Sequence, residues 1–154
     1  MPYRSMAVVR IQYDNGYYIG EVIGSESSPT EEGRGQFFWS NGDHYEGEFL
    51  GGERTGKGIF RWANGDSYEG DFMADTRTGN GIFRWARGDS YEGVFLNGAR
   101  TGKGTIRWAN GERYEGEFLD GHMEGVGIYY SSDGNIIYDG EWIESCPINK
   151  VTDG

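Results

Sequence analysis

Aromatic and charged residues alternate over two short segments in the middle of the chain. In residues 45–49 (YEGEF), the aromatic residues and the glycine occupy every second position, with glutamates between them. Successive side chains of a β-strand point to opposite faces of the sheet. Residues 56–62 (GKGIFRW) alternate in the same way, which puts Gly58, Phe60 and Trp62 on one face and Lys57, Ile59 and Arg61 on the other. The pattern therefore predicts two strands, each with an aromatic face and a charged face.

The two segments recur together every 23 residues. Copies begin at His44, Ser67, Ser90 and Arg113, and they read HYEGEFLGGERTGKGIFRWANGD, SYEGDFMADTRTGNGIFRWARGD, SYEGVFLNGARTGKGTIRWANGE and RYEGEFLDGHMEGVGIYYSSDGN. An isolated hairpin buries too little surface to be stable, whereas stacked copies share contacts and ladder hydrogen bonds. We therefore predict an all-β fold, an extended and twisted single-layer antiparallel β-meander of about 23-residue hairpin repeats.

The ends of the chain carry imperfect copies. We expect a partial repeat or capping strand over residues 1–17, a first repeat over 18–44, and four repeats over 45–137. A half repeat over 138–146 and a tail over 147–154 complete the chain. Atypical terminal copies are typical of repeat arrays, whose end units meet solvent on one side.

Two kinds of connection alternate with the strands. The Asn-Gly pair in ANGD favours a tight turn because both residues tolerate positive φ. We expect the other connection, about Leu50 to Gly56, to be longer. In the first repeat, the additional residues Ser25–Glu32 are expected to lengthen that same turn.

Residues 51–58 (GGERTGKG) come within one residue of a nucleotide-binding loop, since Gly58 stands where the Mg²⁺-binding hydroxyl belongs. Such a loop occurs once and opens a helix. This segment recurs, its lysine becomes Asn80 in the next copy, and a predicted strand follows it. We therefore interpret the likeness as accidental.

Composition narrows the function. The formal net charge of -11 argues against nucleic acid as a partner, and more weakly against anionic membranes. Cys146 is the only cysteine, so no internal disulfide forms, and residues 1–18 lack an apolar stretch long enough for a signal peptide. We expect a cytoplasmic protein. Association with the cytoskeleton or with a membrane is a further expectation.

No residues favour catalysis. The two histidines, His44 and His122, show no metal-ligand spacing with a cysteine, and paired carboxylates abound only because they repeat. We predict a non-enzymatic chain with no catalytic residue, cofactor or metal, although a catalytic domain could exist elsewhere in a longer parent chain.

The succession Y-E-G-E-F, G-K-G and W-x-N-G-D at a 23-residue period resembles the MORN (membrane occupation and recognition nexus) repeat. The resemblance covers about Tyr18 to Ile143, with departures in the longer first turn and in the last full copy, where Ser131 takes the tryptophan position. It implies an extended twisted β-meander with a groove along its aromatic face. It also implies an adaptor that scaffolds cytoskeletal structures, binds a helical peptide or self-associates.

Three hypotheses remain open. The first is an interaction or scaffold module that offers an aromatic groove to a basic helical or extended segment of another protein, through Trp39, Trp62, Trp85, Trp108, Phe60, Phe83, Tyr91 and Tyr114. The second is a membrane-surface module that binds anionic phospholipids through a basic turn column, Arg54, Arg77 and Arg100. The third is a self-associating structural unit that pairs through its edge strands.

Overall fold

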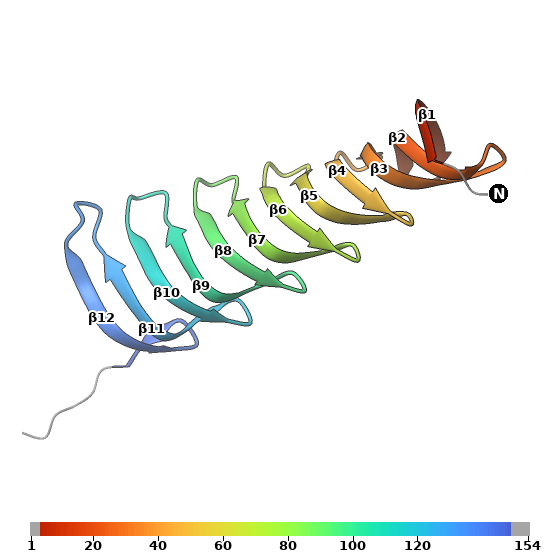
Figure 1. Ribbon diagram of the computed structural model, residues 1–154. Coiled ribbons are helices and arrows are strands. Elements are labelled where there is room, and N and C mark those ends of the chain that lie inside the picture. The colour runs from red at the N-terminus through yellow and green to blue at the C-terminus, as the bar shows by residue number, and fades with distance from the viewer. Residues whose placement is uncertain (1–3, 149–154) are drawn as a thin grey trace, which may run out of the picture.

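A computed structural model describes residues 4–148 and shows one open sheet of thirteen antiparallel strands (Figure 1). Each strand pairs with its neighbours in the sequence, so the predicted all-β meander is confirmed. Residues 1–3 of the expected cap and 149–154 of the expected tail lie outside the described residues. The strands are β1 Arg4–Tyr13, β2 Gly16–Ser25, β3 Ser28–Trp39, β4 His44–Leu50, β5 Glu53–Arg61, β6 Ser67–Met73, β7 Thr76–Arg84, β8 Ser90–Leu96, β9 Ala99–Arg107, β10 Arg113–Leu119, β11 His122–Tyr130, β12 Ile136–Ile143 and β13 Cys146–Pro147.

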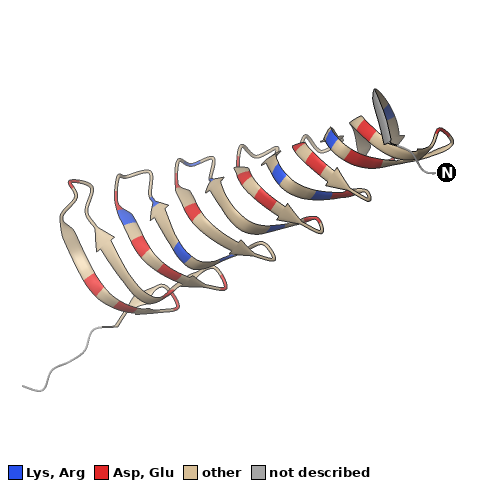
Figure 2. Cartoon of the chain, viewed as in Figure 1, with Lys and Arg blue, Asp and Glu red and all other residues tan. Residues whose placement is uncertain are grey.

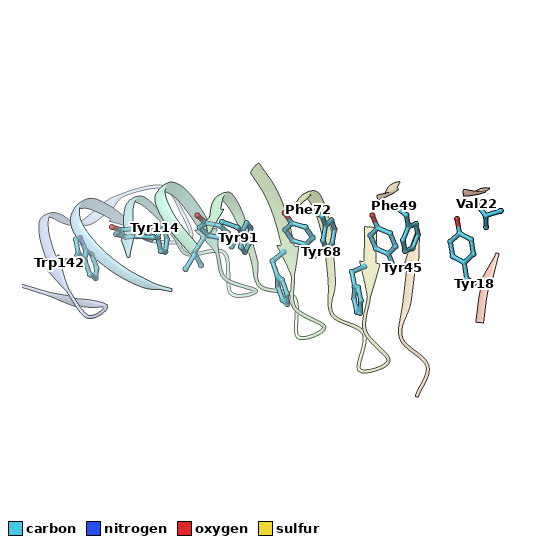
Figure 3. Packing of buried hydrophobic residues seen from close by; sticks show 14 residues of the cluster. Tyr18, Val22, Tyr45, Phe49, Tyr68, Phe72, Tyr91, Tyr114 and Trp142 are labelled. Atoms are coloured by element: carbon cyan, nitrogen blue, oxygen red, sulfur yellow. The ribbon is translucent and has the colours of Figure 1, made fainter. Parts of the chain in front are cut away.

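The core lies on one face of this single layer. The tyrosine that opens each YEG segment is wholly buried, and the phenylalanine four residues later is nearly so (Figure 3). The rings alternate edge-to-face along the sheet, with centroids 5.0 to 5.3 Å apart and ring planes at 80° to 90°. We call this the Tyr–Phe row: Tyr18, Phe49, Tyr45, Phe72, Tyr68, Phe95, Tyr91, Phe118, Tyr114, Trp142 and Tyr138.

A β-bulge follows the paired glycines in five hairpins, β2–β3, β4–β5, β6–β7, β8–β9 and β10–β11. In the β4–β5 hairpin, the register shifts between Gly47 and Glu48, and Gly56 takes a left-handed φ of 57°. The Glu48 carboxylate accepts the N–H of Lys57 at 3.0 Å, which satisfies a backbone donor that the bulge leaves unpaired. Bulges bend the strands that carry them. The strands are accordingly curved in every repeat (Figure 1).

The two connections are the reverse of what the sequence suggested. Leu50 pairs with Glu53, so Gly51 and Gly52 alone form the turn, with φ of 57° and 86°. Two successive positive φ values are the signature of the tight type I′ hairpin turn. The predicted longer connection is wrong because residues 53–56 already belong to β5.

The Asn-Gly segment forms the wider loop. Gly65 has φ of 97° but Asn64 does not enter the left-handed region, because its side-chain oxygen accepts the N–H of Asp66 at 2.9 Å. The N–H of Gly65 is bonded to the carbonyl of Trp62, and the N–H of Trp62 to that of Asp66. In the first repeat, the additional residues lengthen the two strands rather than the turn, since Ser25 pairs with Ser28.

Candidate interaction surfaces

Four tryptophans line one margin of the aromatic face, at the start of each wide loop. Trp62 packs between Phe60 and Phe83, with centroids 4.5 and 5.2 Å away, and it stays partly exposed. Among the described residues, only Trp142 donates its indole N–H to a protein acceptor. The four indoles therefore offer apolar area and an unused donor to solvent. We call them the tryptophan row: Trp39, Trp62, Trp85 and Trp108.

Hollows of the aromatic face adjoin these tryptophans. One of about 340 Å³ is lined by Trp62 and Phe60 together with the turn residues Asp75 and Asn97. Another of about 360 Å³ is lined by Trp39, Phe37 and Asp75, among others. These two hollows each have room for a side chain beside Trp39 and beside Trp62.

The remaining aromatic residues of the predicted groove are buried. Tyr91 and Tyr114 have no exposed surface, and Phe60 and Phe83 are 7% and 9% exposed. Phe60 and Phe83 pack against the tryptophans, whereas Tyr91 and Tyr114 belong to the Tyr–Phe row. In this conformation, direct contact along the predicted groove falls to the tryptophan row.

The predicted basic column also lies on the aromatic face, between the Tyr–Phe row and the tryptophan row. The guanidinium carbon of Arg77 is 5.5 Å from the Trp62 centroid and 5.8 Å from that of Tyr68. Its Nη2 donates to the carbonyl of Gly98 in the next turn at 3.1 Å. Burial lowers the pKa of Arg77 and of Arg100 from the usual arginine value. We call Arg54, Arg77 and Arg100 the arginine column.

Arg54 and Arg100, the other two members of the arginine column, make equivalent contacts. Arg54 donates through Nε to the Asp75 carboxylate and through Nη2 to the Asp75 carbonyl, both at 2.8 Å. Arg100 donates to the carbonyl of Gly121 and lies 5.6 Å from the Trp85 centroid. The donors of the column thus engage carbonyls of the next turn, while its guanidinium groups lie over rings of their own and both adjacent repeats.

Sequence reasoning missed the two ends of this column. Glu31 precedes Arg54 by 23 residues, is 8% exposed, and accepts the hydroxyl proton of Tyr13. Met123 follows Arg100 by 23 residues and packs against the core. Counting back and forward by one repeat from Arg54 and Arg100 would have found both positions.

The wide loops are linked to one another by a carboxylate. Asp43, Asp66 and Asp89 each accept, at 2.7 to 2.8 Å, the N–H of the alanine that follows the next tryptophan. Hydrogen bonds from Ala109 N–H and then from Arg87 hold the pKa of Asp89 below its usual value. Each loop is therefore fixed by the one before it.

The opposite, charged face is hollowed along its length. A depression of about 700 Å³ crosses β3 to β8 and is lined by glycine backbone and by side chains of both charges and neither: Glu46, Glu69, Glu92, Arg34, Lys57, Asn80, Ile59 and Ile82. It shares Arg34 and Glu46 with a smaller hollow of about 200 Å³ toward the N-terminus. One of about 500 Å³ follows on β9 to β11. We call these three hollows the trough; the sequence placed charges here but did not predict it.

The charges of this face are only partly paired. Glu69 lies 3.8 Å from Arg84, and Asp71 forms an ion pair with Lys57. Figure 2 shows acidic residues recurring along successive strands. Cross-strand pairing therefore neutralises some of the acidic residues and leaves others open to a partner.

The described part of the chain contains neither a metal-binding cluster nor a membrane-spanning helix. Within residues 4–148, no group of three or more His, Cys, Asp or Glu side chains is placed to hold a metal ion. In the same residues, no helix has the length and apolar character needed to cross a membrane.

Comparison with known protein families gives a match over residues 31–136. The family model of the MORN repeat matches five consecutive segments, residues 31–44, 45–67, 68–90, 91–113 and 114–136. No curated protein matches the chain at a significant level. The matched segments contain four members of the tryptophan row and all of the arginine column.

Proposed function

Because the chain belongs to the MORN-repeat family, we propose that it binds a segment of another protein along its tryptophan row. The family match supports a repeat-based interaction or scaffold module, and repeats of this family are generally non-catalytic. The contact surface and the nature of the partner are the parts that we add.

One observation carries the proposal. Four tryptophans stand at one per repeat, partly exposed, and each has an indole N–H without an acceptor in the described chain. Tryptophan is enriched at the energetic centres of protein interfaces because it buries a large area and still donates a hydrogen bond. A linear row of this kind suits an extended or helical segment that runs along the sheet.

The negative net charge of the chain favours a basic partner. At a net charge of -11, the molecule attracts basic segments and slows the approach of acidic ones. The hollows beside Trp39 and Trp62 are both lined by Asp75 and Arg54, which are paired with each other, so the preference for a basic partner rests on the charge of the whole chain. A basic polypeptide therefore fits this face better than an acidic one.

The test uses the double variant Trp85→Ala, Trp108→Ala and a partner recovered with the wild-type chain. We expect a β-sheet circular dichroism spectrum and a loss of affinity of at least about tenfold, as for central interface residues. The control is Ile136→Ala, Ile137→Ala, two exposed apolar side chains outside the tryptophan row. Undiminished affinity in a folded tryptophan variant would rule out this surface.

The other two hypotheses lack such an observation. The arginine column points into the aromatic face, where its donors engage carbonyls and rings. The edge of β1 that faces away from β2 has no strand partner in the described sheet, which leaves self-association to be measured by mass in solution.

A further inference from the structure

The arginine column ends in a carboxylate on the N-terminal side. Glu31 occupies the column position of the β2–β3 hairpin, since it pairs with Val22 across the strands as Arg54 pairs with Phe49. The carbonyl of Glu31 also accepts the N–H of Gly52 in the next tight turn, and the carbonyl of each column arginine accepts the equivalent N–H one repeat later. The fold therefore places a negative charge where the next three repeats place a guanidinium.

In those three repeats, the guanidinium lies over aromatic rings. The guanidinium carbon of Arg77 is 5.5 Å from the centroid of Trp62 and 5.3 Å from that of Phe83, within the range of a cation–π contact. Arg54 is likewise 5.2 to 5.9 Å from four ring centroids. The rings around the column thus already hold cations that belong to the chain.

The equivalent rings beside Glu31 are Tyr13 and Phe37. Tyr13 stands at the tryptophan position of its partial repeat, and its centroid lies 5.8 Å from that of Phe37, close to the 5.2 Å between Trp39 and Phe60. Phe37 also packs on Trp39 at 4.5 Å, so three rings come together. Within residues 4–148, no arginine or lysine lies over Tyr13 or Phe37.

The hollow of about 360 Å³ opens at these three rings. The rings line it together with Glu31, Asp75 and Arg54, among others. Asp75 and Arg54 are bonded to each other at 2.8 Å, so their charges offset one another. The hollow therefore combines aromatic rings with one uncompensated carboxylate, that of Glu31.

Glu31 is buried without a cationic partner. It is 8% exposed and forms no ion pair within the described residues. One of its carboxylate oxygens accepts a hydrogen bond from the Tyr13 hydroxyl, and the other accepts none from the described part of the chain. Burial, and then Glu31, raises the pKa of Tyr13 to about 12, so the phenol remains a donor at neutral pH. A buried charge without a partner is costly, and a bound cation would offset that cost.

The lining suits an alkylated ammonium better than a primary one. A lysine ammonium carries three N–H donors that need acceptors. The hollow offers few, because the Asp75 carboxylate is paired with an arginine and one oxygen of Glu31 is engaged by a tyrosine. A quaternary ammonium has no N–H to satisfy, and both aromatic faces and a carboxylate attract it.

We propose that the hollow lined by Tyr13, Phe37 and Trp39 binds an alkylated ammonium group, such as a trimethylated lysine side chain or the head of a choline compound. The rings contact its methyl groups, and Glu31 supplies the opposite charge. This site is independent of the proposed function, since a small free ligand is enough to occupy it.

The probe is N-acetyl-trimethyllysine methylamide, whose only charge is the quaternary ammonium. It is titrated into the full chain, and the indole N–H signals of the tryptophans are followed by two-dimensional NMR after assignment by single Trp→Phe substitutions. We expect a saturable shift of the Trp39 signal and little change at Trp85, which Arg100 already covers. The neutral tert-butyl analogue of nearly the same shape should bind at least about threefold more weakly.

Two variants locate the site. Glu31→Gln keeps an acceptor for Tyr13 but removes the charge, so the affinity should fall at least about fivefold. Glu31→Arg supplies the guanidinium that the later repeats carry, and it should abolish binding while the β-sheet circular dichroism spectrum is retained. The matched control is Glu53→Gln, which neutralises an exposed carboxylate outside the hollow. It should change the affinity by less than about twofold.

Four results would overturn the inference. The absence of a Trp39 shift with every ligand would reject the site. Equal losses in Glu31→Gln and Glu53→Gln would indicate attraction to net charge alone. Equal affinity of the tert-butyl analogue would indicate an apolar hollow without preference for a cation. Equal or tighter binding of N-acetyl-lysine methylamide would reject the alkylated ammonium.

Choline, titrated in parallel, distinguishes the two sources of the ligand. Choline that binds as tightly as the trimethyllysine probe would support the site with a free or lipid-borne head as its ligand. Weaker binding of choline would support the site with a methylated side chain as its ligand.

Discussion

The ring of Tyr91 lies against the backbone of Gly104 on the neighbouring strand, where an added Cβ would stand 2.5 Å from ring carbon Cε2. The Tyr91 hydroxyl donates to the carbonyl of Val94 at 2.9 Å, so the ring is held at both ends. Position 104 must therefore be glycine, because any side chain there would clash with the ring. The same tyrosine–glycine contact recurs along the Tyr–Phe row.

Gly104→Ala should lower the free energy of unfolding by about 1–3 kcal/mol, the usual cost of forcing extra volume into a packed core. The control is Gly51→Asn, at a tight-turn position where nothing lies within 4 Å and where the equivalent Asn97 already has φ of 48°. Urea unfolding of both variants measures the difference. Equal stability of the two would show that the ring moves aside without cost.

Alkaline pH should unfold the sheet cooperatively. Burial raises the pKa of Tyr45, Tyr68, Tyr91 and Tyr114 to about 12, above about 10 for an unfolded tyrosine. Because the folded pKa is raised, the stabilisation is complete below pH 10 and is lost as the pH rises to 12. Phenolate absorbance and circular dichroism should therefore change together in that window. Phenolates that form near pH 10 in a folded sheet would contradict the burial.

Acid should weaken the links between wide loops. The pKa of Asp89 is lowered by its hydrogen bonds from Ala109 N–H and Arg87, so its stabilisation is present above about pH 4 and lost as pH falls through the folded pKa. We expect Asp89→Ala to lower the free energy of unfolding at pH 7 by about 1–3 kcal/mol. The deficit should shrink at pH 3. A constant deficit across that range would assign the effect to shape rather than charge.

The arginine column should be structural. Arg77→Ala removes a charged hydrogen bond to Gly98 and several ring contacts, so we expect a loss of about 1.5–3 kcal/mol in urea unfolding. Arg77→Met should lose less, because Met123 fills the equivalent position in the fourth full repeat. If Arg77→Ala is as stable as the wild type, the column is not structural and the lipid hypothesis gains support.

Vesicle flotation separates the lipid hypothesis from the others. We expect the chain to remain in the bottom fraction with vesicles containing phosphoinositides, because its net charge is -11 and its arginine column is engaged. If the chain floats, Arg54→Gln, Arg77→Gln, Arg100→Gln tests the column without reversing its charge inside the aromatic face. Circular dichroism of that variant must be recorded alongside, since loss of the fold also abolishes flotation.

The repeats and their two faces followed from the sequence because strand alternation is local. Tyr45, Glu46 and Gly47 each lie on the predicted face. The turns were misassigned because Asn64 satisfies its own loop through Asp66, which keeps its φ out of the left-handed region. At the other connection, Ala74 and Asp75 adopt left-handed φ values without any glycine to signal it.

The candidate surfaces were predictable only in part. Alternation put Trp62 and Phe60 on the same face, but it gave no sign that the phenylalanine is buried while the tryptophan stays partly exposed. Arg54 was predicted to lie in a basic turn column. A period-two count does not reveal the bulge at Gly56, past which Arg54 lies over the rings. The trough likewise depends on strand curvature, which is a property of the assembled sheet.

The hydrogen bond from Arg77 to Gly98 and the one from Ala86 N–H to Asp66 both join residues about one repeat apart. Every repeat therefore completes its neighbour and reaches no further. Whole 23-residue units can be inserted or removed without leaving an unmatched interior, provided that the end units are kept. Each repeat lengthens the sheet by about 9.6 Å, so the number of repeats sets the length of the partner segment that the sheet can span.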